Sequence, residues 1–217
     1  MSLENTPLQG ITLYSHADDF RSHWIRLVLA EKQIKYHLVL VDHEDEDLAS
    51  LNPYNRLPML VEQDLKLFNT VIISEYIDDR YRQNKLYADA PMQRAEQRQY
   101  IWRLEQDWLR LADILLCHSD TLSQPEQKQA RQELKDTLVS LTPLFQHFPY
   151  FMSENFTILD CMLAPIFIRL KSMGIELPRQ HCRPILLYCQ RIFSRPAFVK
   201  SMTQQEKNRF NEILVNQ

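Results

Sequence analysis

The residue types best suited to nucleophilic or metal chemistry lie scattered along the chain. The four cysteines include no Cys-x-x-Cys pair and no grouping with histidine of the spacing that a metal site needs. They fall in segments expected to be helical, with no adjacent histidine to lower the pKa of a thiol. We therefore predict no metal site, no catalytic cysteine and no cofactor. We interpret the four cysteines as reduced, mostly buried thiols: Cys117, Cys161, Cys182 and Cys189.

Composition excludes several other kinds of site. Only two of the 217 residues are glycine, so the chain lacks a glycine-rich phosphate loop, which needs several positions without a Cβ. The net charge of −3 gives no basic face, so we predict no sequence-specific nucleic acid binding. The acidic run at 42–47 is interpreted as a solvated loop, with an acidic docking patch as the alternative. No apolar run approaches the roughly 20 residues of a membrane span, and the polar N-terminus resembles no signal peptide, so we expect a soluble, cytoplasmic protein without membrane contact.

The first 81 residues alternate between strand and helix patterns. Leu57-Pro58 precedes a predicted hairpin with a polar turn at Gln63-Asp64. Apolar residues at helical spacing mark two helices. His16 and His23 flank the first of these helices, and we interpret each as an isolated surface histidine. The order β-α-β-β-β-α predicts a thioredoxin-like sheet, with its first two strands parallel. The expected elements are strands at 11–15, 36–41 and within 57–67, and helices at 21–32 and 70–81.

From residue 91 onward the sequence predicts helices alone. Apolar stripes indicate helices around 101–115 and 130–145, separated by a polar break at 119–127 that contains Pro125. A third helix opens near Thr157 and is apolar on nearly every side, so it should be buried. Thr157 and Asp160 have the spacing of a capping box, a structural role that we favour over catalysis. We thus expect a thioredoxin-like domain at 1–86, a linker at about 82–90 and an all-helical domain at 91–217.

Several of these features occur together in one superfamily. Leu57-Pro58 before a strand, the Thr157/Asp160 capping box and the residues 195–198 resemble the glutathione transferase fold. Within that superfamily the chain is most similar to the stringent starvation protein A family, whose members associate with RNA polymerase in Gram-negative bacteria. The resemblance runs from about residue 11 to 202 and is carried by matching stretches in register at 22–32, 75–81, 103–108, 149–153 and 174–177.

The resemblance implies a cis Leu57-Pro58 bond and a former glutathione site that has lost its chemistry. Asp19 stands where many transferases have a serine or cysteine, and a carboxylate there would repel a thiolate. Asn69-Thr70 stands where the family usually has an acidic residue followed by serine. Asn69 therefore lacks the negative charge that would pair with the amino group of the ligand, while Thr70 keeps a hydroxyl that can cap the helix. We therefore predict a vestigial site at Asp19, Leu57, Pro58, Asn69 and Thr70, no catalytic residues and no enzyme activity.

An active transferase would need another hydroxyl. Tyr14, Ser15 and Ser22 are the available substitutes. We interpret Tyr14 and Ser15 as packing at the end of a strand and Ser22 as a residue of the helix start. A glutathione-dependent transferase or peroxidase with an atypical hydroxyl thus stays open as an alternative.

The resemblance also implies a partner. Family members bind RNA polymerase holoenzyme, its sigma factor and core subunits, and regulate transcription in starvation and acid stress. Their partner-facing pocket follows the last helix of the first domain, so the implied surface here comprises Tyr81, Arg82, Gln83, Asn84, Lys85, Leu86 and Pro91. A proline-rich run of the family is replaced by residues 82–85, so a solvated linker without a binding role is the alternative. We expect a homodimer, with a heterodimer with a paralogue and a dimeric scaffold outside transcription left open.

Overall fold

A computed structural model describes residues 10–41, 52–54, 56–117 and 122–215 of the chain, and for 211–215 the backbone alone. The acidic run at 42–47 lies outside these residues. Contacts divide the chain into two compact units, 1–84 together with 196–217, and 85–195, and each is described by itself. The predicted fold class is confirmed: a thioredoxin-like sheet unit accompanies a helical unit. The domain boundaries expected from sequence stay a prediction.

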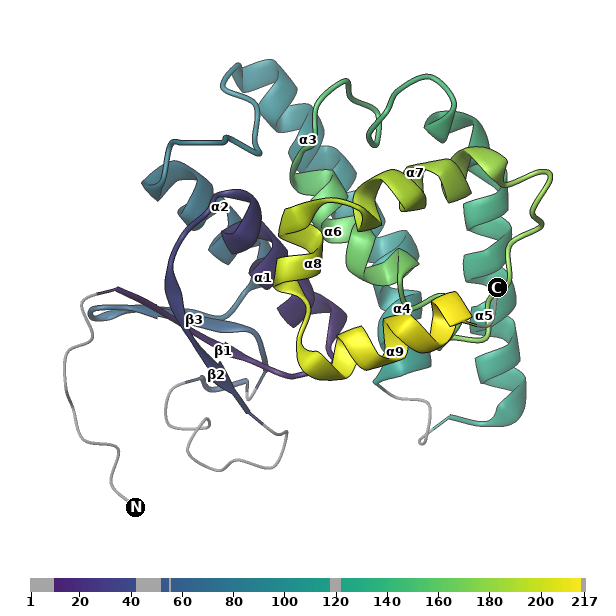
Figure 1. Cartoon of the computed structure of the whole chain (residues 1–217), viewed down its shortest axis with the longest axis horizontal. Coiled ribbons are helices and arrows are strands. Elements are labelled where there is room, and N and C mark those ends of the chain that lie inside the picture. Colours follow the sequence, from purple (N-terminus) through teal and green to yellow (C-terminus); the bar gives the residue numbers. More distant parts are fainter. Residues whose placement is uncertain (1–9, 42–51, 55, 118–121, 216–217) are drawn as a thin grey trace. The chain divides into compact units, whose positions relative to one another are not determined.

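Four strands form the sheet in the order β2-β1-β3-β4 (Figure 1). β1 pairs in parallel with β2 and antiparallel with β3, and β3 and β4 form the predicted hairpin. The hairpin turn needs a positive φ, which Gln63 adopts at 54°. The parallel pair and the added hairpin match the prediction, with strands at β1 (Ile11–Ser15), β2 (Tyr36–Leu40), β3 (Met59–Glu62) and β4 (Leu65–Leu67).

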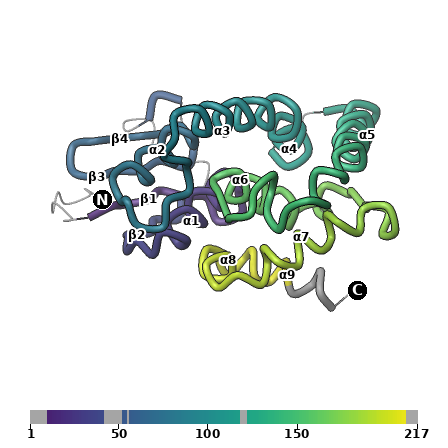
Figure 2. The backbone as a smooth tube through the Cα atoms, turned by 90° about the horizontal axis from the view of Figure 1, so that it is seen from above, coloured from purple at the N-terminus to yellow at the C-terminus, as the bar shows by residue number. Residues whose placement is uncertain are grey.

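Helices from both ends of the chain accompany this sheet. α1 (Phe20–Glu31) follows β1 and contacts α2 (Thr70–Arg80). Near the C-terminus, α8 (Pro196–Ser201) packs against α1 and is followed by α9 (Gln204–Val215), as Figure 2 shows. Residues 22–30 of α1 are all buried, because this helix is enclosed on every side.

The helical unit is built around one buried helix. All ten residues of α6 (Ile158–Phe167) are buried, as its uniformly apolar sequence predicts. The rings of Trp108, Phe145 and Tyr188 pack around Phe167 of this helix, with ring centroids 6.1, 5.8 and 5.7 Å from its own. The surrounding elements are α3 (Pro91–Leu104), the π-helical turn η2 (Glu105–Leu109), α4 (Arg110–Leu116), α5 (Gln124–Ser140), the 3-10 turn η4 (Thr142–Phe145) and α7 (Arg183–Phe193).

The polar break expected at 119–127 ends earlier than predicted. α5 already begins at Gln124, and Pro125 lies in its first turn, where a missing N–H costs no hydrogen bond. Ser123 and Glu126 form a capping box there, which explains why a polar stretch with proline starts a helix rather than interrupting one. No helix in the described segments is long and apolar enough to cross a membrane.

Candidate functional site

Pro58 lies next to the core of the sheet unit. The Leu57-Pro58 peptide bond is cis, as the resemblance implies, and Pro58 is buried. Tyr14 and Leu57 are partly buried against Val41 and Met59. The phenol of Tyr14 thus belongs to a side chain that packs at the strand end, in agreement with its interpretation as a packing residue.

Asp19 caps the helix that follows it. Its carboxylate accepts a hydrogen bond of 2.6 Å from the backbone N–H of Ser22, and its own backbone is extended, as expected for an N-cap. Ser22 is fully buried, and its hydroxyl accepts the N–H of His16 at 3.1 Å. The carboxylate at this family position therefore stabilises α1, and the nearby serine hydroxyl is enclosed within the protein.

Asn69 plays the corresponding role in α2. Its side-chain oxygen accepts the N–H groups of Val71 and Ile72 at 3.0 and 3.1 Å. Thr70 is instead the first residue of the helix and is buried. The capping role that the sequence suggested for Thr70 is thus wrong, because the preceding amide occupies the N-cap position with extended backbone.

A buried polar cluster that sequence reasoning missed joins α1 to the C-terminal segment. The Arg26 guanidinium donates to Ser15 Oγ, to the His16 carbonyl at 3.0 Å, to the Ser201 carbonyl at 2.9 Å and to Glu206 Oε1 at 2.6 Å. Arg26, Ser15 and Glu206 are buried. An arginine inside the apolar run 24–30 was the signal, since a charge there must find partners.

His23 belongs to the same cluster, which corrects its interpretation as a surface histidine. Its side chain is fully buried. His23 Nε2 lies 2.9 Å from Ser201 Oγ, and Nδ1 lies 3.5 Å from Glu206 Oε1. The reason is that α8 covers the face of α1 on which His23 stands.

A second buried charge supports the segment after α2. Lys32 Nζ donates to Asp78 Oδ1 at 2.7 Å and to the carbonyls of Gln83 and Asn84 at 2.8 and 3.3 Å. Both members of the ion pair are fully buried. Asn84 adopts a positive φ of 47° and donates from its side chain to the Glu31 carbonyl. The backbone of this segment is therefore held by a buried ammonium group.

The seven residues of the implied partner surface differ in accessibility. Arg82, Gln83, Asn84 and Pro91 are exposed. Tyr81 is partly buried, and its hydroxyl donates to Glu62 at 3.3 Å.

The remaining two members of that set are held by neighbours in the helical unit. Lys85 forms an ion pair with Asp89. Leu86 is buried, and its carbonyl accepts the N–H of Ile158. Leu86 is only 5% exposed, and it lies among the residues that line the pocket described below, so its role as a partner contact stays a prediction.

Asp160 organises the loop before α6. Its carboxylate accepts the N–H groups of Phe151 and Thr157 at 2.9 and 2.8 Å and the hydroxyl of Tyr188 at 2.8 Å. The Thr157 hydroxyl accepts the N–H of Leu159, which completes the capping box. Burial raises the pKa of Asp160 to about 6, although these donors favour the ionised form.

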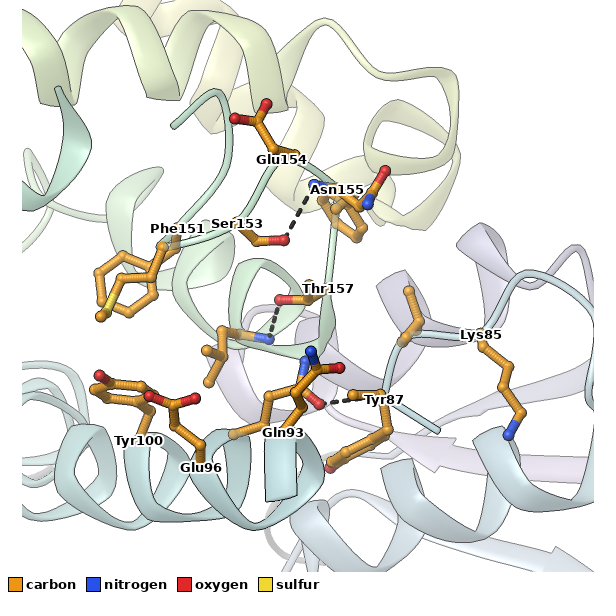
Figure 3. Close-up of a pocket in the computed structure, with 16 residues that line it drawn as sticks. Lys85, Tyr87, Gln93, Glu96, Tyr100, Phe151, Ser153, Glu154, Asn155 and Thr157 are labelled. Carbon is orange, nitrogen blue, oxygen red and sulfur yellow. Dashed lines mark hydrogen bonds between the residues drawn. The ribbon is translucent and has the colours of Figure 1, made fainter. Parts of the chain in front are cut away.

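A pocket of about 540 Å³ opens beside this loop (Figure 3). Residues 85–88, one face of α3 and the loop 151–157 form its walls. Sequence reasoning did not connect these segments, although 149–153 was among the stretches that carry the family resemblance. The pocket lies wholly within the helical unit.

The four cysteines differ more in solvent exposure than predicted. Cys161 and Cys182 are buried, Cys189 is partly buried and Cys117 is exposed. Desolvation raises the pKa of the Cys189 thiol, which disfavours its reactive thiolate.

The comparisons with known proteins agree with this architecture. Residues 9–79 match the family described as "Glutathione S-transferase, N-terminal domain". The structure of Ure2p in complex with glutathione has a TM-score of 0.80 at 16% identity, over 92% of this chain and 95% of that one. The fold is therefore that of the glutathione transferase superfamily.

Two curated relatives define the family more closely. The stringent starvation protein A homolog of Haemophilus influenzae is 38% identical over 93% of this chain and 94% of its own length. The homolog of Pasteurella multocida is 37% identical over 88% of this chain and 90% of its own length. The chain belongs to the stringent starvation protein A family.

Proposed function

We propose that this protein is a non-enzymatic transcription regulator that binds RNA polymerase holoenzyme in the bacterial cytoplasm during starvation or acid stress. Membership of the stringent starvation protein A family, at 38% identity over 93% of the chain, is the observation that carries the proposal. The partner surface is the exposed part of the segment after α2, with Arg82 as its exposed cationic side chain. The buried Lys32–Asp78 pair supports the backbone beside it.

The residues at the former glutathione site support the loss of transferase chemistry. The Asp19 and Asn69 side chains are both engaged as helix caps. Ser15 and Ser22 are fully buried, so neither hydroxyl can reach a thiol that enters from solvent. A glutathione thiolate needs an accessible hydrogen-bond donor or cation, because its charge must be stabilised when it forms.

Affinity purification from starved cells, followed by mass spectrometry, tests the polymerase proposal. The tagged wild-type protein should recover polymerase core subunits and sigma factor, and Arg82→Ala should recover less. Lys128→Ala is the matched control, because Lys128 is an exposed cation on α5, outside the implied partner surface. Recovery of unrelated proteins without polymerase would favour an interaction scaffold outside transcription and reject the proposal.

We further propose that the chain forms a homodimer in which the sheet unit of one copy packs against α3 of the other. Each unit offers a suitable apolar surface. Met92 and Trp102 on α3 are 85% and 58% exposed, and Phe68 after β4 is 38% exposed. Large exposed apolar side chains of this kind are typical of interfaces.

Light scattering at micromolar concentration tests the dimer. The wild type should have twice the chain mass, and Trp102→Glu should shift it toward the monomer. Leu187→Glu, at an exposed leucine on α7, controls for adding a charge to an apolar surface position. A monomeric wild type would rule out the homodimer.

A further inference from the structure

The pocket of the helical unit has two dissimilar walls. On α3, Gln93, Glu96 and Tyr100 follow one another at intervals of three and four residues and thus share one face of the helix. The facing wall is the loop 151–157 (Figure 3). The volume of the pocket, about 540 Å³, lies in the range of pockets that enclose a small ligand or a protruding side chain. The pocket is therefore large enough to bind a group from another molecule.

The charged residues that line the pocket are two carboxylates, Glu96 and Glu154, and one ammonium, Lys85. Glu96 on α3 and Glu154 on the loop are both exposed, and neither carboxylate has an ion-pair partner in the part of the chain that the structure describes. Lys85 is the one cation among the lining residues, and Asp89 pairs with it. Each of these carboxylates attracts positive charge toward its own wall of the pocket.

One aromatic ring of the pocket is available to a cation. Arg94 already lies over the ring of Tyr87 at 5.7 Å, and Arg195 lies over the ring of Phe156 at 4.1 Å. Tyr100 lies one helical turn after Glu96 and carries no such cation among the described residues. A tyrosine ring beside a carboxylate favours a guanidinium or ammonium group, since both attract positive charge.

The loop wall is held in one conformation before any ligand arrives. Asp160 accepts the N–H groups of Phe151 and Thr157, near the two ends of the loop. Met152 lies between them with a φ of 53°, a left-handed conformation that is uncommon for a residue with a side chain. Such backbone conformations persist where the surroundings impose them, often at binding sites. A loop that is already ordered loses little entropy on binding.

The mouth of the pocket suits a peptide rather than an isolated small cation. Gln93 and Asn155 are exposed lining residues, one on each wall, and their side-chain amides can both donate to and accept from a peptide backbone. We infer that this pocket binds an arginine or lysine side chain of a basic segment in a partner protein, with Glu96, Glu154 and Tyr100 as its recognition residues. The pocket shares Lys85 and Leu86 with the implied partner surface, but the inference does not rest on the proposed function, because it requires no particular partner.

A titration followed by amide NMR tests this inference on the full-length protein. The probe is acetylated tetra-arginine amide, and acetylated tetraglutamate amide is the opposite-charge control. Binding of the first should shift the signals of residues 93–100 and 151–157, and the second should leave them unchanged. Free arginine should bind more weakly than the peptide, because it lacks the backbone that the amides recognise.

Substitutions identify the groups responsible. Glu96→Gln, Glu154→Gln and Tyr100→Leu should each raise the dissociation constant for tetra-arginine about two- to fivefold, and the Glu96→Gln/Glu154→Gln double variant about tenfold. Glu176→Gln removes an exposed carboxylate outside the pocket and should leave the constant unchanged.

Two outcomes would overturn the inference. One is equal affinity of the wild type and the double variant, and the other is a set of shifts confined to other acidic residues, such as those of the sequence run 42–47. Loss of polymerase co-purification would leave the peptide result unaffected, so the proposed function and this inference fail separately.

Discussion

Lys32 and Asp78 form a fully buried ion pair, with Nζ and Oδ1 2.7 Å apart, and the same ammonium group donates to the carbonyls of Gln83 and Asn84. One side chain thus connects the end of α1, the last part of α2 and the segment that we propose as the partner surface. The remaining donors of the ammonium are used by the backbone of that segment, which compensates for removing the charge from water.

We predict that Lys32→Met destabilises the protein by about 3–5 kcal/mol, because Asp78 is left as a buried charge without its partner. Urea denaturation measures the change. The double variant Lys32→Met/Asp78→Leu should regain much of this loss, since it leaves no unpaired charge. Equal stability of the single and double variants would show that the pair is not coupled. Either variant should also loosen residues 83–84, which hydrogen exchange can detect.

A second prediction concerns Asp160. Its pKa of about 6 in the folded protein exceeds the unfolded value of 3.8, so the native state binds more protons between these pH values. The contribution of this carboxyl to stability is therefore greatest below about pH 4 and is lost as the pH rises through about 6, a change of about 3 kcal/mol from about two pKa units. Carbon-13 NMR of the carboxyl should give a midpoint near 6. A midpoint near 4 would contradict the prediction.

The third prediction concerns Glu206, which joins the C-terminal segment to α1 through its ion pair with Arg26. Glu206→Leu leaves the buried Arg26 guanidinium without its carboxylate and should cost about 3–5 kcal/mol. Limited proteolysis should then cleave within 196–217 faster than in the wild type. Lys207→Leu, which changes the adjacent and more exposed residue, should leave the cleavage rate nearly unchanged.

The fourth prediction separates structure from catalysis at Ser15. Ser15→Ala removes the hydroxyl that accepts a hydrogen bond from Arg26 and should cost about 1.5–3 kcal/mol, because a buried charged donor loses a partner. Conjugation of glutathione to an electrophilic aromatic substrate should stay at the uncatalysed rate in the wild type, and Tyr14→Phe and Ser15→Ala should not change it. Clear turnover that either substitution abolishes would restore the transferase alternative.

The sheet unit could be predicted closely because its patterns are local. Alternation in 36–41, helical spacing in 21–32 and the polar Gln63-Asp64 turn each depend on a few neighbouring residues. The Thr157/Asp160 capping box is equally local, because its ends are three positions apart. Even the cap at Asn69 follows from a general preference at helix starts, although we assigned it to Thr70.

The contacts that complete each unit join residues far apart in sequence. Arg26 and Glu206 pair across 180 positions, and nothing in the pattern around either residue indicates the other. The pocket similarly brings Glu96 and Glu154 to one cavity from separate segments. In both cases the sequence shows only a charged residue without a partner nearby in the chain. Such a residue indicates that a contact exists, but it does not indicate which distant residue provides it.

Direct binding of the purified protein to purified RNA polymerase holoenzyme tests the central claim most directly. Biolayer interferometry should show saturable binding at micromolar or lower concentration, with Arg82→Ala about fivefold weaker and Lys128→Ala unchanged, as expected for an interface residue worth about 1 kcal/mol. Absence of binding by the wild type at these concentrations would contradict the proposal that this protein acts on the polymerase.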